Sequence, residues 1–243
     1  MALHDPFATG NTAKIYVSGG AVTQVFSSAD FPTVELEASK QRAAYAMGLP
    51  VPAVIEVTEV DGKPALVMKY VPGSTMLERI GDDLGLLPRY LTKSIEIQRA
   101  MHSTRAVGLL VMKVKLERQV HEATGVSDER KAELIAELAD LGSQASVCHG
   151  DFHLQNLIVN GDDVTIIDWM DATAGDPALD VCRSYVLYDS VSDVAAGMYL
   201  QEYCSQTGLP PEDVLRWVPV IAAARLSEQL NDAERQRLLA LAT

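Results

Sequence analysis

Hydrophobic and polar positions predict strands in the first part of the chain. In residues 13–27 and 53–70, apolar side chains alternate or run in short stretches that end at turn residues. Such runs are typical of β-hairpins. Between them, residues 33–47 are rich in helix formers, with Thr33 as the expected cap. The pattern predicts a small sheet that carries one helix.

After residue 76 the apolar period changes to that of helices, most clearly in residues 133–141. Residues 157–167 are different: two short apolar runs flank an Asn-Gly-Asp-Asp turn, which predicts a hairpin. The sequence therefore predicts an α+β fold, with a β-rich N-terminal lobe over residues 1–72 and a helical C-terminal lobe over residues 73–243. The expected helices cover residues 77–80, 88–103, 127–141, 179–189, 194–207, 211–224 and 226–241.

Composition narrows the class of protein. The 243 residues are 48% hydrophobic, which is enough for a sizeable core. A net charge of −13 argues against nucleic acid as a partner, because a protein that follows phosphates needs a basic face. The acidity fits a cationic ligand, and it fits ordinary solubility equally well.

Other features argue against secretion and membrane insertion. No run of eighteen apolar residues is present, and residues 1–14 lack the pattern of a signal peptide. The three cysteines cannot all pair, and none forms a Cys-x-x-Cys motif. Buried, reduced thiols in a cytoplasmic protein are therefore expected. The sequence indicates no oligomeric state.

The strongest chemical signal is the stretch Cys148-His-Gly-Asp-Phe-His-Leu-Gln-Asn156, followed by Ile166-Ile-Asp-Trp169. Phosphoryl transfer of the protein-kinase type uses an Asp as base, then an Asn and a second Asp on Mg²⁺, in that order. The predicted hairpin places Asn156 just before one strand and Asp168 just after the next, so the two side chains can share a cation. Mg²⁺ prefers such oxygen ligands. The pattern thus predicts Asp151 as catalytic base, with Asn156 and Asp168 as metal ligands.

These motifs, together with Ala174-Gly-Asp-Pro-Ala-Leu-Asp180, resemble the aminoglycoside phosphotransferase and choline kinase superfamily. The resemblance covers most of the chain and includes residues 48–52 and 67–73. It implies a bilobal, protein-kinase-like fold and an enzyme that uses ATP and Mg²⁺ to phosphorylate a hydroxyl of a small molecule. It also implies that three residues support the active-site loop, namely His149, Asp176 and Asp180.

The resemblance further implies where nucleotide and acceptor bind. Gly10, Asn11 and Thr12 stand where a phosphate-covering loop belongs, since small residues let backbone N–H groups approach phosphate oxygens. The adenine edge would meet the hinge backbone at Met68, Tyr70 and Val71. Two further groups are implied: Glu37 as partner of a strand lysine, and an acceptor pocket that includes His153, Trp169 and Asp171. For Trp169 and Asp171 the alternatives are core packing and a loop cap, and for His153 the alternative is packing or a hydrogen bond.

One position departs from the family pattern. Gln24 stands where the family usually has a lysine that pairs with the α and β phosphates. Glutamine carries no charge, so the charge-assisted part of that interaction is lost. Either Lys14 or Lys40 substitutes, or turnover is slow, or catalysis has been abandoned. The sequence leaves two hypotheses open: an active small-molecule kinase, and a catalytically weak or inactive nucleotide-binding regulatory protein.

The acceptor is not identified by the sequence. Aminoglycosides, choline-like amines, amino acids, sugars and macrolides are all handled by proteins of the resembled superfamily, and a fold does not determine the acceptor. We expect acceptor specificity in the helical lobe, around residues 169–203 and the C-terminal helices. The acidic surroundings of the motif favour a cationic acceptor.

Overall fold

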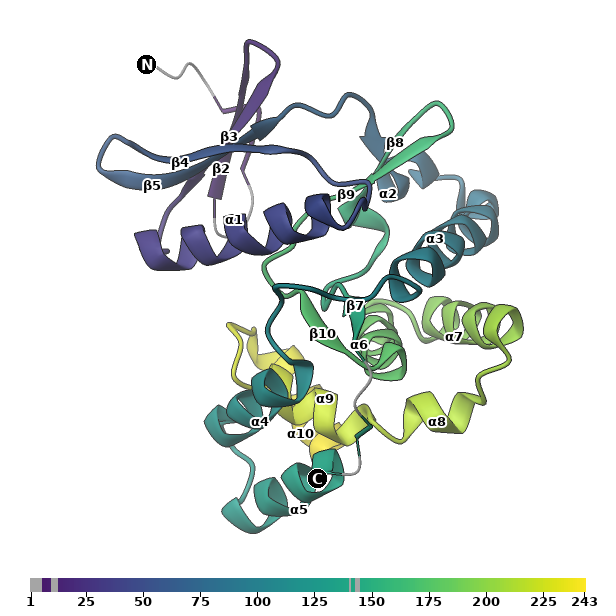
Figure 1. Cartoon of the computed structure of the whole chain (residues 1–243). Coiled ribbons are helices and arrows are strands. Elements are labelled where there is room, and N and C mark those ends of the chain that lie inside the picture. The colour runs from purple at the N-terminus through teal and green to yellow at the C-terminus, as the bar shows by residue number, and fades with distance from the viewer. Residues whose placement is uncertain (1–5, 10–12, 140, 143–144) are drawn as a thin grey trace. The chain divides into compact units, whose positions relative to one another are not determined.

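The computed structural model describes residues 6–9, 13–139, 141–142 and 145–243 (Figure 1). The predicted Gly10, Asn11 and Thr12 loop lies outside the described residues. The chain forms two compact units. The first unit comprises residues 1–79 and 155–170, and the second comprises residues 80–154 and 171–243. The predicted hairpin over residues 157–167 therefore belongs to the first unit, as the N-terminal sheet does, whereas the sequence predicts it within the helical C-terminal lobe.

The first unit contains an antiparallel sheet that has, among the described residues, the strand order β1-β2-β3-β5-β4. Gln24 is at the centre of this sheet, paired with Ile15 on one side and Leu66 on the other. The strands are β1 (Ala8–Thr9), β2 (Ala13–Ser18), β3 (Ala21–Phe26), β4 (Val54–Val60) and β5 (Lys63–Lys69).

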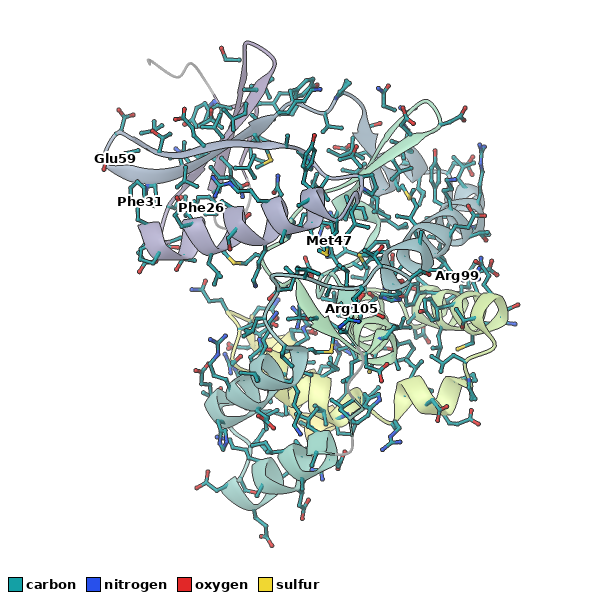
Figure 2. All side chains as sticks on the ribbon, in the orientation of Figure 1. Phe26, Phe31, Met47, Glu59, Arg99 and Arg105 are labelled. Carbon is teal, nitrogen blue, oxygen red and sulfur yellow. The ribbon has the colours of Figure 1, made fainter. Side chains whose placement is uncertain are left out.

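Helix α1 (Phe31–Ala46) packs against strands β4 and β5 (Figure 1). It begins earlier than predicted: the cap is Asp30, whose carboxylate accepts the amide of Thr33 at 2.9 Å. The expectation that Thr33 is the cap was therefore wrong, because Asp30 satisfies an amide of the first turn and proline is tolerated there. Phe26, labelled in Figure 2, belongs to the apolar core that α1 shares with the sheet.

The predicted hairpin is confirmed as β8 (Leu157–Asn160) and β9 (Asp163–Ile166). A short strand, β6 (Ser74–Thr75), pairs with β8 and leads into helix α2 (Met76–Ile80). Gly73 permits this close pairing, since a Cβ atom there would lie 2.2 Å from the carbonyl oxygen of Val159.

The second unit is mostly helical. Its helices are α3 (Leu87–His102), α4 (Met112–Glu122), α5 (Asp128–Ala139), α6 (Pro177–Asp189), α7 (Asp193–Thr207), α8 (Pro211–Leu215), α9 (Val218–Arg225) and α10 (Asp232–Ala242). It also contains a small ladder of β7 (Ser146–Cys148) and β10 (Thr173–Gly175). Short 3₁₀ turns are η1 (Leu84–Leu86) and η2 (Leu154–Asn156).

The helices differ from the prediction in three places. Helix α4 was not predicted. The predicted helix over residues 211–224 is divided into α8 and α9, because Pro219 has no N–H for a continuing helix and suits a new first turn. Helix α10 begins only at Asp232, where Asn231 caps it by accepting the amide of Glu234 at 2.9 Å.

The cysteines Cys148, Cys182 and Cys204 are all buried and unpaired. Burial raises the pKa of the Cys148 and Cys182 thiols above the ordinary value, so both stay protonated near neutral pH. Among the described residues, no helix is both long and apolar enough to cross a membrane.

Candidate functional site

The first unit contains a cavity of about 790 Å³, a volume within the usual range for ligand pockets. Its wall is formed by alternate residues of β2 and β3, by the chain after β5, and by the base of the β8–β9 hairpin. The predicted nucleotide and metal residues on this wall are Gln24, Glu37, Met68, Tyr70, Val71, Asn156 and Asp168.

Strand alternation decides which side chains face the cavity. Ala13, Ile15 and Val17 line it, whereas Lys14, between them in β2, is exposed. Because successive side chains of a strand point to opposite faces, Lys14 belongs to the other face of the sheet. Gln24 is on the cavity face, opposite Ile15 in the ladder. Lys14 is thus poorly placed to replace a strand lysine.

Backbone hydrogen bonds fix the end of β5 and the residues that follow it along the cavity wall. The amide of Lys69 donates to the carbonyl of Ala53 at 2.9 Å, and that of Tyr70 donates to Gly20 at 2.9 Å. These two bonds hold in place the segment that carries Met68, Tyr70 and Val71.

The buried face of helix α1 carries three polar side chains, Glu37, Lys40 and Gln41. Glu37 is 3% exposed and lines the cavity, and Lys40, one turn later, is 6% exposed. The Lys40 ammonium donates a hydrogen bond to the backbone carbonyl of Met170. Gln41, next on this face, donates to the carbonyl of Pro52 at 2.7 Å. Buried charged groups of this kind require polar partners.

Asn156 and Asp168 flank the open end of the β8–β9 hairpin. Leu157 pairs with Ile166, and the amide of Ile167 donates to the carbonyl of Asn156 at 3.0 Å. Both predicted metal ligands therefore line the same cavity. Asp168 has a left-handed backbone with φ of 66°, which is uncommon for a residue other than glycine and clusters at functional sites.

Trp169 is fully buried, and its indole N–H donates to the carbonyl of Ile166 at 3.0 Å. This contact lies within the first unit and closes the turn after Asp168. Of the two roles considered for Trp169, the contact favours packing over the lining of an acceptor pocket.

In the second unit, the loop His149-Gly150-Asp151 is held by backbone contacts. His149 is buried, and its Nδ1 accepts the amide of Asp151 at 3.2 Å. Gly150 has φ of 79°, and a Cβ atom there would lie 2.5 Å from the carbonyl oxygen of Asp171. Only glycine fits this position, so the loop has one backbone course.

The carboxylate of Asp151 lies 3.3 Å from Nε2 of His153, and each side chain is about a quarter exposed, at 24% and 23%. Burial by itself would raise the pKa of Asp151. The hydrogen bond and charge of His153, with the charges of Arg183 and His149, outweigh burial and hold this pKa well below its usual range. Asp151 is thus an ionised carboxylate at neutral pH.

Asp180 joins the loop to helices α3 and α6. Its carboxylate accepts the amide of Gly150 at 2.6 Å, His102 at 2.9 Å and the Gln98 amide at 3.1 Å. Burial raises the pKa of Asp180, but these hydrogen bonds, the His102 bond first, lower it below its usual value. Asp176 caps α6 by accepting the amide of Ala178 at 2.9 Å.

A chain of alternating charges extends from this loop across the second unit. Sequence reasoning missed it, because its pairs are mostly far apart in the sequence. We call it the ion-pair chain; its members, in order of contact, are Lys115, Asp171, Arg183, Glu228, Arg225, Glu234, Arg237 and Asp189. Arg183 connects it to the loop His149-Gly150-Asp151, since its Nε donates to the carbonyl of Gly150.

The ion-pair chain changes the interpretation of Asp171. Its carboxylate lies 2.5 Å from the Lys115 ammonium and 3.4 Å from the Arg183 guanidinium. Burial raises the pKa of Asp171, but these two cations outweigh burial and lower it. Asp171 is thus already paired with two cations, which weakens its case as a binding group for a cationic acceptor.

Comparisons with known proteins agree with this arrangement of fold and motifs. Residues 6–240 match the profile of the phosphotransferase enzyme family (APH), so the chain belongs to that family of kinases. The fold is the α+β, kinase-like fold of this family: an antiparallel sheet with one helix, then a mostly helical part with small sheets. A comparison with curated protein sequences finds no significant match.

Solved structures with the same fold include a thermostable mutant of aminoglycoside phosphotransferase APH(4)-Ia, in a ternary complex with AMP-PNP and hygromycin B. Its TM-score is 0.74 at 16% identity, over 98% of this chain and 90% of that one. A choline/ethanolamine kinase family protein from Mesorhizobium loti has a TM-score of 0.67 at 18% identity, over 99% and 86%. APH(3'')-Id from Streptomyces rimosus has 0.66 at 18% identity, over 93% of both chains.

Proposed function

We propose that this protein is an ATP- and Mg²⁺-dependent kinase that moves the γ-phosphate of ATP to a hydroxyl group of a small molecule. The observation that carries the proposal is that Asn156 and Asp168, from the two ends of one hairpin, line a single cavity of nucleotide size. Membership of the phosphotransferase family supports the same reaction class.

The cavity wall suits a nucleotide. Apolar side chains of β2, β3 and β5 form the surface on which we place adenine, beside the backbone of Met68, Tyr70 and Val71. We place the phosphates near Gln24 and Glu37, and we propose that Gly10, Asn11 and Thr12 offer them backbone N–H groups. A glutamine there offers neutral hydrogen bonds where a lysine would offer a charge.

The residues at the hairpin base fit Mg²⁺. Asn156 offers an amide oxygen and Asp168 a carboxylate, and both face a cavity large enough for phosphates and water to complete the coordination. A bound Mg²⁺ would neutralise phosphate charge during transfer. The role of the two side chains is to hold that ion at a defined place beside the nucleotide.

We assign Asp151 as the base that orients the acceptor hydroxyl and accepts its proton. The lowered pKa of Asp151 keeps the carboxylate ionised, and His153 limits its rotation through the 3.3 Å contact. Asn156 is the fifth residue after Asp151, so chain geometry limits the distance between their Cα atoms to about 18 Å. His149 and Asp180 support this loop through the contacts described above, and Asp176 caps the helix that carries Asp180.

The acceptor is a small molecule with a free hydroxyl. Hygromycin B is bound to the APH(4)-Ia relative, and an amino-alcohol kinase shares the fold, so amines with hydroxyl groups are the first class to test. The net charge of −13 fits a cationic acceptor, whereas the pairing of Asp171 with two cations does not. Three buried thiols fit a cytoplasmic location, where ATP is available.

A second function is favoured by one specific observation. Gln24 occupies the cavity face where the resembled family has lysine, and an uncharged residue at this position is compatible with nucleotide binding without useful turnover. The alternative is therefore a regulatory protein that binds nucleotide and transfers phosphate slowly or not at all.

The test is acceptor-stimulated formation of ADP from ATP, with and without Mg²⁺, across amino alcohols, aminoglycosides and sugars. The matched variant is Asp151→Asn, which keeps the shape of the side chain and removes the base. We expect kcat to fall by about 10² to 10⁴ with the melting temperature unchanged.

ADP release that needs an acceptor and disappears in Asp151→Asn would support the kinase. Equal turnover in wild type and variant would remove Asp151 from its role. Tight binding of ATP with no acceptor-dependent turnover would favour the regulatory alternative, and Gln24→Lys would then separate the cases, because a gain of activity identifies Gln24 as the impairment.

A further inference from the structure

Strand β3 has Gln24 on the cavity face where the resembled family usually has a lysine, so another residue must supply positive charge to a bound nucleotide. We propose that Lys40, on helix α1, supplies the cation that balances the metal-ligand carboxylates and the nucleotide phosphates. This inference rests on the proposed nucleotide-binding function and specifies which residue carries the charge.

The other basic residues that the structure describes in the first unit are exposed. Lys14 is on the opposite face of β2, and Lys63 is at the turn end of β5. Arg42 lies 3.3 Å from Glu35 on the surface of α1, and Arg79 follows β6 in helix α2. Lys69 lines the cavity but is exposed to solvent, and it pairs with Ala21 at the end of β3 that lies away from Phe26.

The position of Lys40 differs in burial and in neighbours. Glu37 and Gln41 both line the cavity and are four residues apart on α1, so they lie on the same side of the helix. Lys40 lies between them in the sequence and is also on the buried face. Its ammonium donates to the carbonyl of Met170, two residues after Asp168. A single side chain therefore connects the helix to the backbone of the turn that carries the predicted metal ligand.

Charge balance explains why a lysine occupies this place. Removing an ammonium from water costs several kcal/mol unless anions and hydrogen-bond acceptors compensate. The Met170 carbonyl is a neutral acceptor, which many polar side chains could use. Three carboxylates, Glu37, Glu78 and Asp168, line the adjoining cavity, and a nucleoside triphosphate would add more negative charge. A buried cation beside these groups is retained because it offsets them.

The experiment measures nucleotide binding without turnover, by titration calorimetry with Mg²⁺ and AMP-PNP. The variants are Lys40→Met, which removes charge and donor, and Lys40→Gln, which keeps a donor for the Met170 carbonyl and removes only the charge. Lys14→Met is the matched control, because it deletes the same charge from the other face of the sheet. Adenosine, which has no phosphate, is the second ligand.

We expect both Lys40 variants to bind AMP-PNP at least tenfold more weakly while adenosine affinity stays within twofold of wild type, and Lys14→Met to bind both ligands as wild type does. Adding Gln24→Lys to Lys40→Gln should recover most of the lost AMP-PNP affinity, since it places a cation on the wall of the cavity.

Wild-type AMP-PNP affinity in Lys40→Gln would overturn the proposal. So would an equal loss of adenosine and AMP-PNP binding, which would indicate that Lys40 only holds the fold, and so would a failure of Gln24→Lys to restore affinity. If wild type bound neither ligand, the nucleotide-binding function itself would fail, and the Lys40 proposal would fall with it.

Discussion

The backbone amide of Gly150 donates a 2.6 Å hydrogen bond to the buried carboxylate of Asp180. On its other side, the carbonyl of Gly150 accepts from Nε of Arg183. The backbone N–H and the backbone C=O of Gly150 are thus both hydrogen-bonded to ionised side chains of α6. Asp151 is the next residue in the chain. Hydrogen bonds to charged groups are stronger than neutral ones, so helix α6 determines where the loop His149-Gly150-Asp151 lies.

Replacing Gly150 by alanine tests this dependence. The new Cβ atom would lie 2.5 Å from the carbonyl oxygen of Asp171, at a residue whose φ is 79°. We expect about 2 kcal/mol of lost stability in urea unfolding, and loss of turnover, because the loop must move. Gly161→Ala is the control: its φ is 61° and no atom lies within 4 Å of the new Cβ, so it should lose about 1 kcal/mol and keep its activity.

Arg183→Met should lower kcat far more than it changes the KM for ATP. The change removes the bond to the Gly150 carbonyl and leaves Asp171 and Glu228 with fewer cationic partners. Steady-state kinetics measures the effects on kcat and on the KM for ATP separately. The matched control is Arg225→Met, because Arg225 pairs with Glu228 and Glu234 in the same ion-pair chain, without a described bond to Gly150. Equal kinetic effects in the two variants would contradict the positioning role of Arg183.

The pH dependence of turnover should reveal the contact between Asp151 and His153. Because the folded-state pKa of Asp151 is below its unfolded value of about 3.9, this carboxylate stabilises the fold above that pH, and the contribution is lost as pH falls through the folded pKa. In wild type we expect no acidic limb from Asp151 in kcat/KM between about pH 5 and 8.

His153→Ala removes the hydrogen bond and charge that oppose burial, so the pKa of Asp151 should rise. The acidic limb of kcat/KM should then move to higher pH, with turnover at high pH preserved. A profile that does not move would show that His153 does not control the ionisation of Asp151.

Trp169→Phe distinguishes packing from acceptor binding. The indole is fully buried and donates to the Ile166 carbonyl at 3.0 Å, so its loss should cost about 1–2 kcal/mol in unfolding free energy. The KM for the acceptor should remain that of wild type. A large rise in this KM, with stability unchanged, would instead place Trp169 in the acceptor pocket.

The sequence was informative where structure depends on neighbouring residues. The β8–β9 hairpin was predicted because its turn and its apolar flanks are contiguous, and that hairpin brings Asn156 and Asp168 to one cavity. Helix α4 was missed because charged residues dominate it, although Met112, Leu116 and Val120 recur every four residues and are all buried.

Long-range polar contacts were beyond sequence reasoning. Lys115 and Asp171 are 56 residues apart, and Arg183 and Glu228 are 45 apart, so no local pattern pairs them. The same holds for Lys40 and Met170, which are 130 residues apart. Charge by itself is readable from a sequence, but the partner of each charge is a property of packing.

The burial of Cys148, Cys182 and Cys204 has a practical consequence for spectroscopy. Thiolates are the species that react with maleimides and with spin-label reagents, and these thiols are both shielded and kept protonated, with raised pKa values. The three native cysteines should therefore react little with such reagents. A cysteine introduced at exposed Ile55 in the first unit and another at exposed Val194 in the second would accept probes selectively, and the distance between the probes would report in real time whether the two units move when nucleotide is added.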